Sequence, residues 1–148
     1  MSTATDRADL IELFGRYADI ADLKEFTELP ALVFTDPLTL DFSSVADIPP
    51  MTVPLAGYVE TLRGAFAPYT ATHHAITGHV VTIDGDRATI HAHVRAEHWL
   101  PDEPARWLVV GFYDNEAVRT PDGWRLSRVK LTASHQENAH LSSAALAR

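Results

Sequence analysis

The sequence predicts a single α+β domain, in which about three N-terminal helices pack on one face of a strongly curved, mostly antiparallel sheet. Two observations predict this class. Helical periodicity is confined to the first 67 residues, and residues 71–134 alternate as long strands separated by short turn sequences. Helices followed by sequential strands are typical of α+β domains. A bent sheet covered by helices encloses a cavity, where small ligands usually bind.

The composition agrees with one globular domain that spans residues 1–148. Hydrophobic residues make up 46% of the chain and charged residues 22%. No apolar run reaches the ~18 residues of a membrane-spanning helix and the start lacks the features of a secretion signal, so we expect a cytoplasmic protein. The net charge of −8 disfavours binding to nucleic acid, and the absence of cysteine excludes disulfides and thiolate zinc sites.

The N-terminal third predicts two helices and a strand. Apolar residues recur with a helical period over residues 6–22, and acidic residues lie in the first turn. A shorter helix is expected from Leu23 to about Val33, where Pro30 either kinks it or divides it into two turns. A turn at residues 35–37 then leads into a strand at residues 38–44, in which apolar and polar side chains alternate.

The middle of the chain predicts a lid and a third helix. Residues 45–55 contain three prolines among apolar residues, which indicates a loop over the surface or over a cavity mouth, and its apolar content favours a lid. The third helix is expected from about Leu55 to Ala67, because Pro68 restricts the residue before it.

Four strands of a meander follow, at residues 71–83, 87–100, 105–118 and 124–134, with turns at residues 84–86 and 120–123. The small and polar residues from about 136 to 148 are expected to form a frayed tail.

Strand periodicity sorts the histidines, because alternate side chains face opposite sides of a sheet. His98 shares its face with four small apolar or branched residues, whereas His91 and His93 lie among charged neighbours. In the preceding strand, His74 is in phase with Ile76 and Val80 and is predicted to point inward. His73 and His79 have the opposite phase, although a bulge would reverse the phase partway along.

Two inward histidines on adjacent strands favour proton transfer at neutral pH. Taken singly, each is as often a core side chain whose nitrogens bond backbone carbonyls. A metal site is disfavoured, because His73 and His79 cannot join His74 on an unbroken strand and no helix carries two histidines four residues apart. We also find no NAD or flavin motif and expect no cofactor.

A histidine that acts as a base usually needs a carboxylate on its other ring nitrogen. Asp22 lies at the edge of the apolar arc of the first helix, next to Ala18, whereas Asp19 lies farther toward solvent. Asp22 is therefore the predicted partner of His74, the alternative being a helix-end carboxylate in water.

The chain resembles SnoaL-like domains of the nuclear transport factor 2-like superfamily, the group that includes scytalone dehydratase. The resemblance covers nearly the whole chain and rests on five motifs in order, "RYADIADLKEF", "LTLDF", "THHAITGHVVTIDGDRATI", "RAEHW" and "DGWRL". It implies a cone-shaped α+β barrel whose pocket holds an Asp–His pair and a second histidine. These roles fall on Asp22, His74 and His98, which periodicity also selects.

The departures from the dehydratase pattern bear on the substrate. Two tyrosines that polarise the substrate carbonyl in the dehydratase correspond here to Ala21 and Phe42, which argues against scytalone. A serine and an asparagine are also replaced, near Gly111 and Tyr113. Tyr17 and Tyr113 are the expected hydroxyl donors of the pocket, unless they pack in the core with their hydroxyls at the surface. The full set of expected lining residues is Tyr17, Phe42, Tyr58, Val109, Tyr113 and Val129.

Residues and resemblance together predict a cofactor-independent dehydratase, cyclase or isomerase that acts on a small, apolar, cyclic or aromatic, polyketide-like substrate. Asp22 would orient His74, His74 would remove a proton, and His98 would donate one to the leaving oxygen. The alternatives are an epoxide-opening hydrolase or cyclase, and a non-catalytic ligand-binding or accessory subunit. A homodimer is expected through the outer face of the sheet, along the row His91, His93, Arg95, Glu97 and Trp99.

Overall fold

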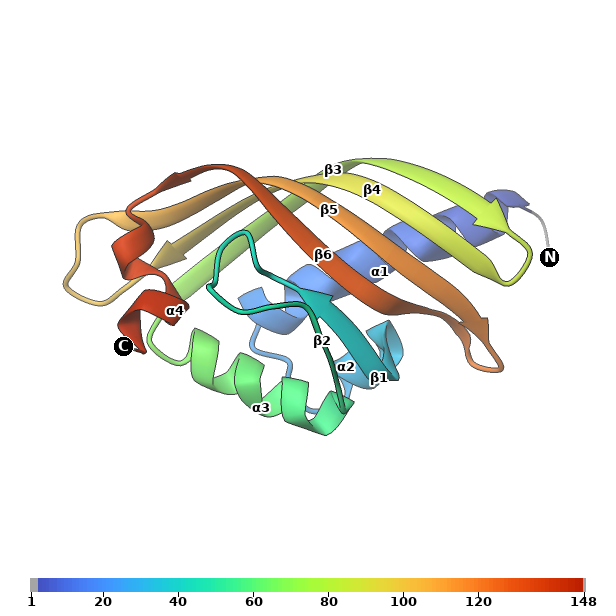
Figure 1. Ribbon diagram of the computed structural model, residues 1–148, viewed down its shortest axis with the longest axis horizontal. Helices are drawn as coiled ribbons and strands as arrows, with labels where there is room; N and C mark the ends of the chain where they lie inside the picture. The colour runs from blue at the N-terminus through green and yellow to red at the C-terminus, as the bar shows by residue number, and fades with distance from the viewer. Residues whose placement is uncertain (1–2, 148) are drawn as a thin grey trace.

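The computed structural model describes residues 3–147 and contains a curved six-stranded sheet with helices against one face (Figure 1). The strand order is β2 (Met51–Val53), β1 (Phe34–Asp41), β6 (Gly123–Glu137), β5 (Arg106–Thr120), β4 (Arg87–Trp99) and β3 (Ala71–Asp84). Every neighbouring pair is antiparallel except β1 and β6, which run parallel. The predicted α+β class is confirmed. The sheet does not close into the barrel that the resemblance implied, because β2 and β3 remain as its two edges.

The helices cover the concave side of the sheet and enclose the hydrophobic core with it (Figure 1). Helix α1 (Thr3–Asp22) buries one apolar face, and α3 (Leu55–Phe66) ends before Pro68 as predicted. Helix α2 (Leu29–Val33) is shorter than the predicted helix from Leu23. The reason is Lys24, whose φ of 55° ends α1 in the left-handed conformation and turns the chain away. Pro30 then lies in the first turn of α2, where a missing N–H costs nothing.

Strand β1 (Phe34–Asp41) includes residues 35–37, which the sequence predicted as a turn. Its register against β6 shifts between Phe34 and Thr39, so the irregular residues are accommodated within the strand. The predicted loop at residues 45–55 contains a short edge strand, β2 (Met51–Val53), which pairs with β1. Its earlier part stays outside regular strands and helices, and Val45, Ala46 and Ile48 border the cavity described below.

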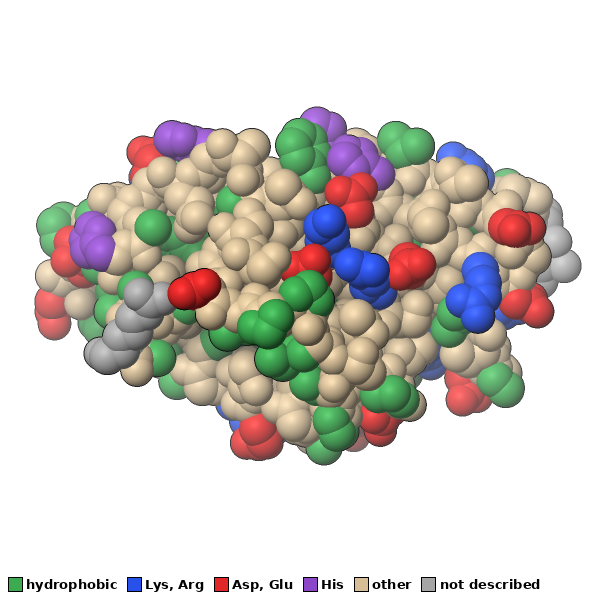
Figure 2. Space-filling view, viewed as in Figure 1, with side chains coloured by type: hydrophobic (Ala, Val, Ile, Leu, Met, Phe, Trp, Pro, Cys, Tyr) green, Lys and Arg blue, Asp and Glu red, His purple; other side chains and the backbone are tan. Residues whose placement is uncertain are grey.

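The predicted meander consists of β3 (Ala71–Asp84), β4 (Arg87–Trp99), β5 (Arg106–Thr120) and β6 (Gly123–Glu137). Strand β4 alternates without interruption, so Ile90 and His98 are buried while His91 and His93 face outward, as predicted. The outward face is polar and mixed in charge. His91 pairs with Asp114, and Arg95 pairs with Glu97. Figure 2 shows acidic, basic and histidine side chains interspersed over one side of the molecule.

A β-bulge in β3 reverses the side-chain alternation partway along the strand. Thr77 lies opposite His93 and Val80 opposite His91, so β3 carries one residue more than β4 in this interval. Gly78 adopts a φ of +64° at the bulge, a conformation that glycine accepts readily. His79 consequently turns inward, with its ring 4.9 Å from that of Phe14, and Val80 is 60% exposed. The predicted inward phase of Val80 and outward phase of His79 are therefore wrong.

The C-terminal residues, expected as a frayed tail, form a 3₁₀ turn, η1 (Ala139–Leu141), and a short helix, α4 (Ser143–Leu146). Leu141 is buried, and its carbonyl accepts a hydrogen bond of 2.8 Å from the Tyr69 hydroxyl. This contact fixes the C-terminal segment against Tyr69, which lies just before β3. Among the described residues, no helix is long and apolar enough to cross a membrane.

Candidate active site

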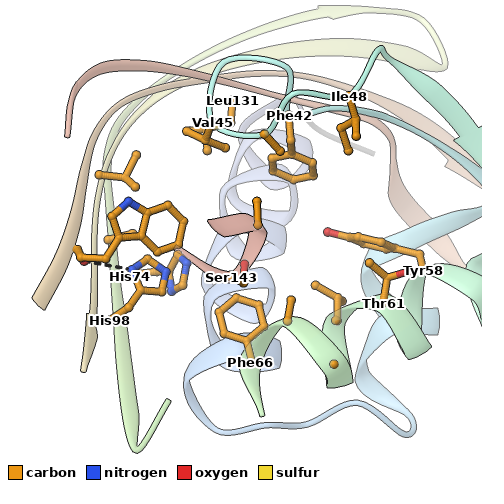
Figure 3. A pocket seen from close by; sticks show the side chains of 18 of the residues that line it. Phe42, Val45, Ile48, Tyr58, Thr61, Phe66, His74, His98, Leu131 and Ser143 are labelled. Atoms are coloured by element: carbon orange, nitrogen blue, oxygen red, sulfur yellow. Dashed lines mark hydrogen bonds between the residues drawn. The ribbon is translucent and has the colours of Figure 1, made fainter. Parts of the chain in front are cut away.

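A cavity of about 460 Å³ lies between the concave face of the sheet, α3 and the C-terminal segment (Figure 3). Its volume is in the range of small-molecule sites. Most of its wall is apolar, and the loop before β2 contributes Val45 and Ile48. The polar side chains that reach the cavity belong to Tyr17, Tyr58, Glu60, Thr61, His74, His98, Tyr113 and Ser143.

Asp22 and His74 meet at one wall of this cavity. His74 Nδ1 lies 2.7 Å from Asp22 Oδ1, and the backbone N–H of His74 donates to Asp22 Oδ2 at 2.7 Å. The Thr72 hydroxyl donates to Asp22 Oδ1 at 2.9 Å. A carboxylate can only accept, so Nδ1 of His74 carries a proton and Nε2 presents a lone pair. Among the described residues, His74 Nε2 has no hydrogen-bond partner and is free to act on a bound molecule.

The environment of Asp22 keeps its carboxylate ionised. Burial raises the pKa of Asp22, but the hydrogen bond and positive charge of His74 and the Thr72 hydroxyl lower it by more, so the pKa lies below its usual value. The side chains of Asp22 and His74 are only 15% and 10% exposed. An ionised carboxylate on Nδ1 fixes the imidazole ring and stabilises the cation that forms when Nε2 takes a proton.

His98 lies beside His74 on the neighbouring strand (Figure 3). Thr72 is its direct partner across β3 and β4, and the rings of His74 and His98 are 5.6 Å apart. His98 Nδ1 lies 3.1 Å from the carbonyl oxygen of Trp107, which can only accept, so Nδ1 carries the proton here as well. The His98 ring also stacks on that of Trp107, at 4.2 Å.

Burial and the nearby His74 lower the pKa of His98 to about 4. The side chain is 4% exposed, so little water reaches the ring. At neutral pH His98 is therefore uncharged, and its Nε2 can only accept a hydrogen bond. This state disfavours the role of proton donor that the sequence suggested for it. The reason is desolvation, which penalises the imidazolium that a donor would need.

The structure places five of the six predicted lining residues on the cavity wall: Tyr17, Phe42, Tyr58, Val109 and Tyr113. The prediction for Val129 is wrong. Its side chain is completely buried beside β1, where it pairs with Leu40, and Leu131 takes the lining position two residues later.

Several lining residues escaped the sequence predictions. Trp107 has the strand phase of Val109 and Tyr113, so periodicity could have found it. Ser143, Ala144 and Ala147 could not be found in this way, because their composition indicated a solvated tail. Within residues 3–147, no three histidine, aspartate or glutamate side chains are grouped to hold a metal ion.

Residues 2–130 match the sequence profile of the SnoaL-like domain, and the chain belongs to this family. A crystal structure of the Kfla4162 protein from Kribbella flavida is 75% identical and superposes with a TM-score of 0.93, over 95% of this chain and 98% of that one. An uncharacterized protein of Mycobacterium tuberculosis (strain H37Rv) is 27% identical over 90% of this chain and 88% of its own length.

Two more distant structures share the nuclear transport factor 2-like fold. One is named "Putative Scytalone Dehydratase" and comes from Novosphingobium aromaticivorans; it has a TM-score of 0.80 and 18% identity over 91% of this chain and 88% of that one. The other is a hexachlorocyclohexane dehydrochlorinase, LinA type 2, with a TM-score of 0.77 and 17% identity over 90% of this chain and 88% of that one. At these identities the likeness concerns the fold alone.

Proposed function

We propose that this protein is a cofactor-independent acid–base enzyme, a dehydratase, cyclase or isomerase, that acts on a small, apolar, cyclic or aromatic substrate. The observation that carries this proposal is the Asp22–His74 pair at the wall of the cavity. An ionised carboxylate 2.7 Å from Nδ1 leaves the opposite ring nitrogen as a base, and that nitrogen meets a largely apolar space. The names of the distant structural neighbours are consistent with lyase chemistry on this fold.

His74 Nε2 removes a proton from a carbon next to a carbonyl, or from a hydroxyl. Asp22 holds the ring and stabilises the imidazolium. The same nitrogen returns the proton to the leaving oxygen or to another carbon, so the sequence of steps balances without a redox partner. A positioned base of this kind contributes about 10²–10⁴-fold in rate. An apolar cavity that excludes water contributes further by orienting the substrate.

His98 has a different task from that of a second acid. Its neutral ring accepts a hydrogen bond at Nε2 and can orient a substrate hydroxyl beside His74. Burial and the charge of His74 both lower the pKa of His98, so His98 stays neutral when His74 takes up a second proton. His74 is thus the member of the pair that cycles between neutral and charged forms.

A hydrogen-exchange experiment tests the base. β-Tetralone, an enolisable bicyclic ketone, is incubated with the protein in heavy water, and the loss of its α-hydrogen signals is followed by proton NMR. We expect the protein to accelerate exchange, and the variants His74→Gln and Asp22→Asn to reduce that acceleration by about 10²–10⁴-fold. Asp19→Asn is the matched control, since Asp19 lies one turn earlier on the same helix and is exposed.

Circular dichroism checks whether each variant keeps the fold. If the two dyad variants exchange the ketone as fast as the wild type, the base is elsewhere. If the protein binds the ketone without accelerating exchange, a carrier without catalysis is the better description.

A further inference from the structure

Thr72 bonds the Asp22 carboxylate from the same face of β3 as His74. The two residues are separated by one position, so their side chains point to the same side of the strand. The register places Thr72 opposite His98 and His74 opposite Ala96, and both partners are buried on the inward face. One strand face therefore presents a hydroxyl and an imidazole to one carboxylate.

Three donors of the described chain reach Asp22, and they are divided unequally between its two oxygens. Oδ2 accepts the backbone N–H of His74 at 2.7 Å. Oδ1 accepts both the ring Nδ1–H of His74 at 2.7 Å and the Thr72 hydroxyl at 2.9 Å. A carboxylate can only accept, so the single proton of the Thr72 hydroxyl is committed to Oδ1. The ring and the hydroxyl thus meet at one oxygen.

Two of these donors belong to stiff parts of the chain, and the third is the ring that must be held. The backbone N–H of His74 is part of the strand, and the Thr72 side chain is branched at Cβ, which restricts its rotation. With the backbone N–H alone, Asp22 would be anchored at Oδ2 while Oδ1 could swing. The Thr72 hydroxyl supplies a second anchor, at the oxygen that faces the ring.

The place of Asp22 in the fold gives this donor a further use. Asp22 is the last residue of α1, where the partial negative charge of the helix end disfavours a carboxylate. Burial also raises the pKa of Asp22, and the hydrogen bonds from His74 and Thr72 lower it. The Thr72 hydroxyl therefore helps to keep the negative charge that stabilises the His74 imidazolium.

A second histidine–aspartate pair in the same molecule lacks such an anchor. His91 Nδ1 lies 2.7 Å from Asp114 Oδ1, the same distance as between His74 and Asp22. The side chains of His91 and Asp114 are 43% and 54% exposed, and no other donor among the described residues bonds Asp114. The two pairs share a distance but differ in what holds the carboxylate.

We propose that Thr72 is a positioning residue for the base: its hydroxyl fixes Oδ1 of Asp22 against the ring, so that Nε2 of His74 points into the cavity before a substrate arrives. Thr72 does not border the cavity and acts only through Asp22. The effect on rate rests on the proposed function. The control that Thr72 exerts on the hydrogen bond between Asp22 and His74 is independent of turnover.

Kinetics of β-tetralone exchange in heavy water test the effect on rate. Thr72→Val removes the hydroxyl and keeps the shape of the side chain, whereas Thr72→Ser keeps the hydroxyl. We expect Thr72→Val to lower kcat about tenfold, as for one hydrogen bond, and to leave KM unchanged because Thr72 does not touch the ligand. Thr72→Ser should restore most of kcat. Thr70→Val is the matched control, since the Thr70 hydroxyl bonds the Trp99 carbonyl at 3.1 Å, just before β3.

Exchange of the His74 Nδ1–H with water tests the hydrogen bond without any substrate. Labelling of histidine with ¹⁵N and comparison with His74→Gln assign its signal in the proton NMR spectrum. We expect slow exchange in the wild type and in Thr72→Ser. Exchange should be about tenfold faster in Thr72→Val and in Thr72→Ala, because the carboxylate then opens more often.

An unchanged kcat or an unchanged Nδ1–H exchange rate in folded Thr72→Val overturns the proposal, and so does a Thr72→Ser protein that behaves like Thr72→Val. If neither the valine nor the alanine variant folds, the wild type decides. A His74 Nδ1–H that exchanges as fast as that of His91 overturns the proposal, and a slower one supports it. A wild type that does not exchange the ketone rejects the proposed function, while the NMR result still upholds or rejects the anchor at Asp22.

Discussion

Asp22 holds His74 at two points, with one carboxylate oxygen 2.7 Å from the ring Nδ1 and the other 2.7 Å from the backbone nitrogen. The last residue of α1 is thereby connected to β3 through both the main chain and the side chain of one residue. A ring held in this way keeps the orientation that a base needs before the substrate arrives.

Replacing Asp22 by asparagine should lower both stability and activity. The amide offers one acceptor oxygen in place of two, so one of the two His74 donors is left without a partner, at a cost of about 1–3 kcal/mol. Urea unfolding at neutral pH measures this loss. Because the folded-state pKa of Asp22 is depressed, its contribution is present above about pH 4 and is lost as the pH falls through the folded value. A wild type and an Asp22→Asn variant with identical acid sensitivity would contradict the structure.

His98 should make folding weaken on mild acidification. Its pKa is about 4 when folded, against an ordinary value of 6.5, so the unfolded chain binds a proton first. The stability is complete above about pH 6.5, falls between pH 6.5 and 4, and loses at most about 3 kcal/mol from this residue. His98→Asn keeps a side-chain donor for the Trp107 carbonyl but does not titrate, and it should flatten this part of the curve. The NMR shifts of His98 should report the Nδ1–H form down to about pH 4.

The bulge at Gly78 predicts a site where alanine is poorly tolerated. Its φ is +64°, and an added Cβ would lie 3.0 Å from the His93 ring. Gly78→Ala should therefore lower the free energy of unfolding by about 1–2 kcal/mol, as measured by urea unfolding. Gly15→Ala is the control, because Gly15 is exposed within α1 and a Cβ added there would meet no atom within 4 Å. That change should stabilise by about 0.5–1 kcal/mol.

Asp6 provides a test that separates folding from chemistry. It is buried near the start of α1 and accepts hydrogen bonds from Arg119 at 2.8 and 3.2 Å and from the Trp124 indole at 3.1 Å. Asp6→Asn should lower the urea midpoint, because the amide repels one of these donors. The exchange rate of β-tetralone should stay unchanged, since none of the three residues borders the cavity. A loss of exchange in the folded variant would point to coupling between the two ends of α1.

The sequence was sufficient for those features that depend on unbroken periodicity. The inward phase of His98 followed from β4, which has no bulge, and Asp22 followed from the apolar arc of α1. Periodicity failed at Gly78 and at Lys24. At each position one residue with a positive φ redirects the chain, and the pattern of apolar and polar residues does not show this.

The state of the site was also beyond the sequence. His98 could be placed on the correct face, but its neutral form follows from the Trp107 carbonyl and from burial, which only the assembled structure shows. Val129 and Leu131 share one strand face. Only the pairing with β1 shows that Val129 is covered, whereas Leu131 lines the cavity.

The contact between Tyr69 and Leu141 has a practical consequence for work with the protein. The Tyr69 ring lies 5.2 Å from that of His98, and its hydroxyl holds the segment that carries Ser143 and Ala144 over the cavity. Removing the residues from Leu141 onward, or attaching a purification tag close behind Leu141, should open the cavity to water. The pKa of His98 would then rise toward that of a free imidazole. A few residues with the composition of a dispensable tail therefore form part of the cavity wall.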